Sequence, residues 1–166
     1  LIFFATFLAL FRLMPHPPNF TPIISTAIIA PILSRNRLFG SSIPILAMFI
    51  SDIFLGFHVY QIVIYLTLLF ISFITPMKKK YLQIILMSVV GSLFFFLTTN
   101  FAVWIIWDFY PKTFEGLISC YTLAIPFFQN TIISTCFFSI ILTFLSKYLI
   151  KINNISVNVI DKMLKY

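Results

Sequence analysis

Long apolar runs, separated by short groups of proline, glycine and charged residues, form the main pattern of this chain. The runs occupy residues 1–14, 23–33, 43–57, 59–75, 82–107 and 127–150. A helix needs about 20 mainly apolar residues to cross the hydrocarbon core of a bilayer, and tilted or broken segments account for longer and shorter runs. The pattern predicts an all-α membrane protein with about six transmembrane helices, in which residues 1–150 form a single integral membrane domain.

Prolines break this pattern in two places. Residues 15–22 are Pro-His-Pro-Pro-Asn-Phe-Thr-Pro, and proline removes backbone donors and restricts the residue before it, so this segment after the first run cannot be helical. Residues 1–13 are too few for a crossing, and we expect them to be the remaining end of a first span. Pro126 divides the last apolar stretch, so residues 117–125 are predicted to lie at the interface or to re-enter, while residues 127–150 cross.

The composition agrees with a membrane protein. Of the 166 residues, 61% are hydrophobic and 9% are charged, whereas a soluble domain has about 45–50% apolar and about 25% charged residues. A soluble domain, a disordered chain, a disulfide scaffold and a nucleic-acid binder are therefore poorly supported. The net charge of +7 would suggest a nucleic-acid partner in a soluble protein, but here the basic residues lie between apolar runs.

Alternating crossings divide these basic residues unevenly between two faces. Nine of the eleven fall on one face, namely Arg35, Arg37, Lys78, Lys79, Lys80, Lys147, Lys151, Lys162 and Lys165. The positive-inside rule then places this face and both termini in the cytoplasm, with the chain in the inner (plasma) membrane and the lipid bilayer as its partner. Residues 151–166 carry apolar side chains at helical spacing, which predicts a short amphipathic cytoplasmic tail or a continuation of the last span.

Almost every unusual residue falls on the opposite, outer face. Irregular backbone at membrane depth persists only where it is buried in protein or lines a cavity, because lipid cannot satisfy its polar groups. Several broken and polar segments on one side therefore predict an outward-facing pocket for a small molecule. Its candidate substrate-binding residues are His16, Asn19, Thr21, Asp52, His58, Asn100, Trp104 and Asn130.

Asp52 is the most informative of these residues. It lies inside the third apolar run, where a carboxylate costs about 2.5–3.5 kcal/mol at mid-span, so an intramembrane acid is a functional candidate. It could bind a ligand, relay a proton or pair with Arg12. The structural alternative is that it caps the broken backbone around Asn19 or Thr21.

Metal binding and catalysis are poorly supported. Asp52 and His58 are six residues apart and do not share a helix face, and there is no HxxxH or HExxH motif, so we predict neither a metal nor a cofactor. The four acids are scattered along the chain and there is no Walker loop, so we predict no enzymatic activity and no ATP hydrolysis by this chain. His16 is more simply a turn-stabilising or ligand-facing residue.

Two other groups of residues have structural as well as functional interpretations. The amides of Asn19, Asn100 and Asn130 suit either hydrogen bonds between helices or orientation of a substrate. The second apolar run carries a small-residue face, suited to internal packing or to docking of a second membrane subunit, at Ser25, Ala27 and Ala30.

Two sequence motifs carry a resemblance to known proteins. RLMPHPPNFTP at residues 12–22 and SDIFLGFH at residues 51–58, extended by NFAVW at residues 100–104, resemble an uncharacterised bacterial family of multi-pass membrane or transport proteins. This chain departs from that family in its second run, which lacks the usual glycine. More distantly, its architecture is similar to the substrate-binding S component of energy-coupling-factor importers, which implies a separate membrane coupling subunit and two ATPases as partners.

We expect a membrane transport component that captures a vitamin or other small metabolite from outside. One alternative is a proton-coupled carrier in which Asp52 titrates. Another is a structural or assembly subunit of a membrane complex, with its polar turn serving as an interface.

Overall fold

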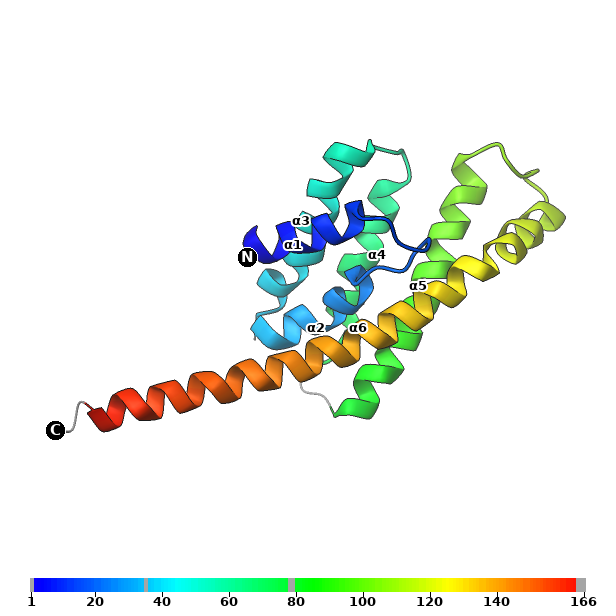
Figure 1. Ribbon diagram of the computed structural model, residues 1–166. Coiled ribbons are helices and arrows are strands. Elements are labelled where there is room, and N and C mark those ends of the chain that lie inside the picture. The colour runs from blue at the N-terminus through cyan, green and yellow to red at the C-terminus, as the bar shows by residue number, and fades with distance from the viewer. Residues whose placement is uncertain (1, 35, 78–79, 164–166) are drawn as a thin grey trace.

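The computed structural model of the chain describes residues 2–34, 36–77 and 80–163, and it is helical throughout (Figure 1). Within those ranges there are six helices and no strand: α1 (Ile2–Leu13), α2 (Ile23–Ser34), α3 (Arg37–Leu55), α4 (Gln61–Ile74), α5 (Tyr81–Ile106) and α6 (Phe114–Met163). The all-α class predicted from the apolar runs is thus confirmed. Three helices are long and apolar enough to cross a membrane, with bounds Arg37–Leu55, Tyr81–Ile106 and Phe114–Tyr148.

The short helix α2 lies at the centre of the bundle. It packs against α3, α4, α5 and α6, and every residue from Ile23 to Pro31 is buried. Ser72 on α4 donates a 2.8 Å hydrogen bond to the carbonyl oxygen of Ala27. With 12 residues, α2 is roughly 18 Å long at about 1.5 Å per residue, which is less than the thickness of a bilayer core. Its hydrophobicity on all sides is explained by this central position.

The small-residue face of α2 is used inside the bundle. Ser25 and Ala27 are fully buried, and Ala30 is 5% exposed. Small side chains let neighbouring backbones come close, so this face serves internal packing. It is not available for docking a second subunit.

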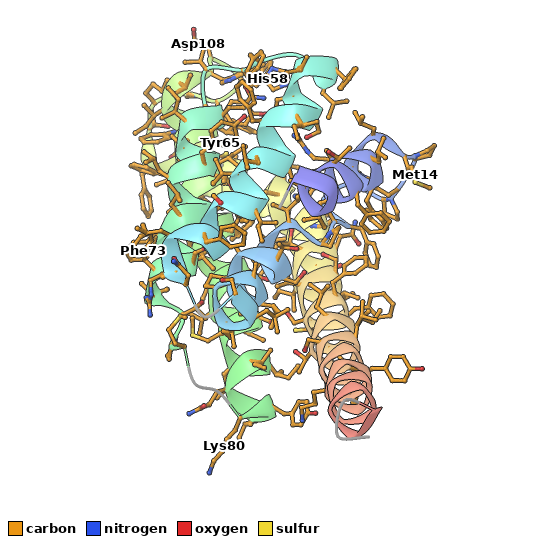
Figure 2. The ribbon with its side chains drawn as sticks, turned by 90° about the vertical axis from the view of Figure 1, so that its left-hand side faces the viewer. Met14, His58, Tyr65, Phe73, Lys80 and Asp108 are labelled. Carbon is orange, nitrogen blue, oxygen red and sulfur yellow. The ribbon has the colours of Figure 1, made fainter. Side chains whose placement is uncertain are left out.

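α1 has a different orientation from its neighbours. It packs against α3 and lies across it, whereas α3, α4 and α5 run along a common direction (Figures 1 and 2). The chain then passes through the proline-rich turn into α2. The prolines therefore redirect the chain in the middle of the bundle, as the sequence predicted.

α6 continues through Pro126, which contradicts the expected division of this stretch into residues 117–125 and 127–150. Proline removes one hydrogen-bond donor, but packing on α5 holds the helix on both sides of it. Before the proline, the Tyr121 hydroxyl donates to the carbonyl oxygen of Leu97 at 2.7 Å. After it, the Phe128 ring stacks on Phe96 with centroids 4.4 Å apart.

The helix also extends into the predicted tail. Residues 151–163 belong to α6, so the tail begins as a continuation of the last apolar helix. Residues 164–166 and the side chains after residue 148 lie outside the described part, and with them the predicted amphipathic face. Arg35, Lys78, Lys79 and Lys165 from the basic face are outside it as well.

A stripe of buried hydroxyl groups joins α5 and α6. Thr131, Thr135, Ser139 and Thr143 recur every four residues and so share one face of α6. Ser88 on α5 donates a 2.9 Å hydrogen bond to Ser139 Oγ. Among the described residues, the buried hydroxyls of Ser92 and Thr135, at the next turn of the two antiparallel helices, have no hydrogen-bond partner.

Replacing the two serines of α5 by alanine is expected to have different effects. Ser88→Ala leaves Ser139 without its partner from α5 and should cost about 1 kcal/mol of unfolding free energy. Ser92→Ala removes a buried hydroxyl that has no partner in the described residues, so its effect should be neutral or stabilising. Chemical unfolding of both variants in detergent would measure the difference, and a larger loss for Ser92→Ala would contradict this explanation.

Gly40 on α3 allows the backbones of α2 and α3 to pack closely together. A Cβ atom on residue 40 would overlap the backbone of Pro31. Gly91 on α5 also faces the core, but there the heavy atom nearest to a Cβ would be Ile71 Cγ2, at an ordinary contact distance of 3.4 Å.

Gly40→Ala is therefore expected to destabilise the bundle, with Gly91→Ala as its matched control. Overpacking costs about 1–3 kcal/mol of unfolding free energy. The cost of Gly40→Ala should lie at or above the upper end of this range, because the atoms that the new Cβ would overlap belong to the backbone of Pro31. Gly91→Ala should change the unfolding free energy by less than about 1 kcal/mol. Thermal unfolding of the purified variants would check this, and equal melting temperatures would refute it.

Candidate functional site

Two adjoining cavities lie between the proline-rich turn and helices α3 to α6. Their volumes are about 220 Å³ and about 450 Å³. Both are bounded by Arg12, Asn19, Ile64, Phe95 and Thr131, and we call them together the Arg12 cavity. The smaller part is also lined by His16, Thr21, Ile23, Ile24, Met48 and Leu55. The larger part is also lined by Pro18, Tyr60, Phe96, Thr99, Asn100, Val103, Ala124 and Phe127.

An ion pair between Arg12 and Asp52 forms one side of this cavity. Arg12 lies in the last turn of α1, and its Nη1 donates to Asp52 Oδ1 and, at 2.5 Å, to Ser51 Oγ. The Tyr65 hydroxyl on α4 donates to Asp52 Oδ2 at 2.5 Å. Both carboxylate oxygens thus have a donor, as a buried charge requires.

Burial differs sharply between the two charges. The side chain of Asp52 is fully buried, whereas that of Arg12 is 21% exposed and borders the cavity. Of the roles considered for Asp52, pairing with Arg12 is the one the structure shows. Asp52 lies behind Arg12, and it holds the arginine in place without lining the cavity.

The proline-rich turn is held by a set of backbone contacts. Asn19 has a positive φ of 62°, a left-handed conformation that asparagine tolerates better than most residues. Phe20 N–H donates to the Pro17 carbonyl at 3.0 Å, and Thr21 N–H to the Asn19 carbonyl at 3.1 Å. His16 brings Nδ1 to 2.9 Å from the Pro17 carbonyl oxygen and Nε2 to 3.2 Å from that of Arg12. A neutral imidazole has a single N–H, so His16 braces the turn by donating to one of these two carbonyl oxygens, according to its tautomer.

Two side chains of α6 attach this turn to the rest of the bundle. Asn130 Nδ2 donates to the Pro18 carbonyl at 3.0 Å, and Ser134 Oγ donates to the Asn19 carbonyl at 3.3 Å. In each of these two hydrogen bonds, the donor and the acceptor residue are more than one hundred positions apart in the sequence. Asn130 thus holds the turn that forms one wall of the cavity, through a contact between α6 and the turn and not between two helices.

Comparison with known proteins places the chain in a family. Residues 1–156 match the model of a family of unknown function (DUF6580). The chain belongs to this family. No curated protein and no solved structure matches it. The match agrees with the sequence-based expectation of an uncharacterised family, and DUF6580 brings no assigned activity with it.

In this DUF6580 member, the predicted site residues fall into separate groups. The cavity is lined by His16, Asn19, Thr21 and Asn100. Asp52 and Asn130 lie behind the lining and hold it in place.

His58 and Trp104 lie away from the cavity lining. His58 is exposed beside Tyr60, with ring centroids 5.7 Å apart, and its backbone N–H donates to Gln61 Oε1 at 2.7 Å. Trp104 Nε1 donates to the Pro111 carbonyl at 2.9 Å, in the connection between α5 and α6. Both residues stabilise connections at the end of the bundle that carries Asp108 (Figure 2).

Three residues that line the cavity were not among the candidates predicted from the sequence, namely Arg12, Phe95 and Thr131. Arg12 carried a signal, because an arginine within an apolar run is as costly as an aspartate there. Thr131 begins the four-residue hydroxyl repeat of α6, but this repeat does not show that its first member reaches a cavity. In the described part of the chain, no three His, Cys, Asp or Glu side chains come together as a metal site would require.

A double-mutant cycle tests whether Asp52 is mainly the partner of Arg12. Asp52→Asn or Arg12→Gln alone leaves one charge without its partner and should cost about 3–5 kcal/mol. The double variant Arg12→Gln/Asp52→Asn removes both charges with little change of shape, so its loss should be much smaller than the sum of the two. Unfolding free energies of the purified variants provide the cycle, and additive losses would show that the two charges act independently.

Proposed function

We propose that this protein is a membrane transport component that captures a small molecule, such as a vitamin or other metabolite, in the Arg12 cavity. The observation that carries the proposal is the cavity itself. Its two parts are bounded by residues of all six helices and by a turn fixed through α6. A concave space whose apolar walls are interrupted by polar groups is typical of small-molecule sites.

A location in the plasma membrane fits the surface of the bundle. Large apolar side chains are exposed on most of its helices, for example Leu38 at 71%, Leu66 at 60% and Leu82 at 69%. Such a surface suits lipid contact. We propose six membrane segments, of which α1 and α2 form a broken pair and α4 is a short crossing beside the three long helices.

The orientation proposed for the bundle follows from its charges. Lys80 lies at one end, and His58 and Asp108 lie at the other (Figure 2). Arg37 begins α3 and Lys80 immediately precedes α5, so both are at the same end, which the positive-inside rule assigns to the cytoplasm. Leu55, Tyr60 and Val103 belong to the opposite half of the bundle and line the cavity, so it would open to the outside.

The two alternative functions have less support. A carrier that titrates Asp52 would need this carboxylate to exchange protons, but both oxygens already accept hydrogen bonds and the side chain is fully buried. An assembly subunit would not need an internal cavity with polar groups. ATP-driven import would require a separate coupling subunit with ATPases, because the sequence has no Walker loop.

Filling the cavity is expected to abolish capture. In Thr99→Trp a large side chain on α5 occupies the larger part, while Thr122→Trp places the same side chain on the exposed face of α6. Native mass spectrometry of protein purified from membranes should detect a retained small molecule in the wild type and in Thr122→Trp but not in Thr99→Trp. Equal retention in both variants, or none in the wild type, would count against capture in this cavity.

A further inference from the structure

We propose that the ligand of the Arg12 cavity is a small organic anion whose carboxylate is bound by the free edge of the Arg12 guanidinium. This inference rests on the proposed function and specifies its substrate class. Its basis is the distribution of donors, charges and apolar walls around the cavity.

The hydrogen bonds of Arg12 leave one edge of its guanidinium unused. In the described part of the chain, its side-chain hydrogen bonds, to Ser51 and Asp52, all come from Nη1. The N–H groups on Nη2 and Nε therefore have no protein acceptor there. Nε and Nη2 form a planar, two-pronged edge of the kind that binds a carboxylate in a bidentate manner. The side chain borders both parts of the cavity, so a ligand in either part can reach this edge.

The charges around the cavity favour an anion. Among the lining residues, Arg12 is the one permanently charged side chain, and no carboxylate lines the space. Asp52 lies behind Arg12, and its oxygens are turned to Arg12 and Tyr65.

One cation also limits the charge of the ligand. Because Arg12 already shares its charge with Asp52, the cavity can balance a carboxylate better than a phosphate dianion. Polar and apolar groups both line the space around this point, with the rings of Phe95, Phe96 and Phe127 in the larger part. A carboxylic acid with a compact apolar or aromatic body fits this combination.

Benzoate is a suitable first probe, with benzamide as its neutral isostere. Calorimetric titration of the full-length chain in detergent should show saturable binding of benzoate and binding of benzamide at least tenfold weaker, because benzamide lacks the charge. Phenyl phosphate distinguishes a carboxylate site from a phosphate site, and it should also bind more weakly than benzoate.

The variant Arg12→Lys removes the two-pronged edge of the guanidinium but keeps the positive charge. Lysine keeps a positive charge near Asp52 but cannot form the bidentate contact, so benzoate affinity should fall about 10- to 100-fold. Arg37→Lys is the matched control at the other end of the bundle and should leave the affinity unchanged. The charge-free double variant Arg12→Gln/Asp52→Asn should also lose benzoate binding, and a cooperative melting transition would show that this variant is folded.

Three results would overturn the assignment of an anion. These are absence of benzoate binding to the wild type, equal affinity for benzoate and benzamide, and unchanged benzoate affinity in Arg12→Lys. Benzamide binding as tight as that of benzoate, and abolished by Thr99→Trp, would overturn the anion class while the cavity still captured a ligand. Failure of the function itself is recognised separately, because the wild-type protein would then retain no small molecule from the membrane.

Discussion

A buried ion pair joins three helices, each of which contributes one side chain to it. Arg12 comes from α1, Asp52 from α3 and the hydroxyl of Tyr65 from α4. Two charges in an apolar bundle are tolerated only when each has a partner and the remaining lone pairs accept hydrogen bonds. The pair therefore fixes α1 across α3, and it turns the guanidinium toward the cavity. Stability and ligand chemistry depend here on the same contact.

A second constraint acts on the break between α1 and α2: backbone N–H and C=O groups need hydrogen-bond partners where water is absent. The proline-rich turn meets it through its own carbonyl contacts and through Asn130 and Ser134 of α6. The short helix α2 meets it by being enclosed on all sides. Polar backbone and side chains thus gather at one depth in the bundle, and the Arg12 cavity lies beside them.

The helices and the break after the first run could be predicted because apolar length and proline are local properties of the sequence. The path of α6 through Pro126 could not, since contacts of Tyr121 and Phe128 with α5 override the local tendency of proline. At the site, Asn19 and Asn100 were identified as unusual polar residues in apolar sequence. The pairing of Arg12 with Asp52, forty residues away, was one of several roles left open for Asp52, and the contact between α1 and α3 that selects it is not encoded in any local pattern.

The position of α2 has a consequence for the order in which the chain is completed. Helix α2 is too short to be held across a bilayer by its own hydrophobicity. Its neighbours α5 and α6, and the side chains that hold the turn before it, are made last during synthesis. The N-terminal third therefore reaches its final position only after α6 has been made, so a chain that stops before α6 lacks the cavity even though Arg12 and Asp52 are both present.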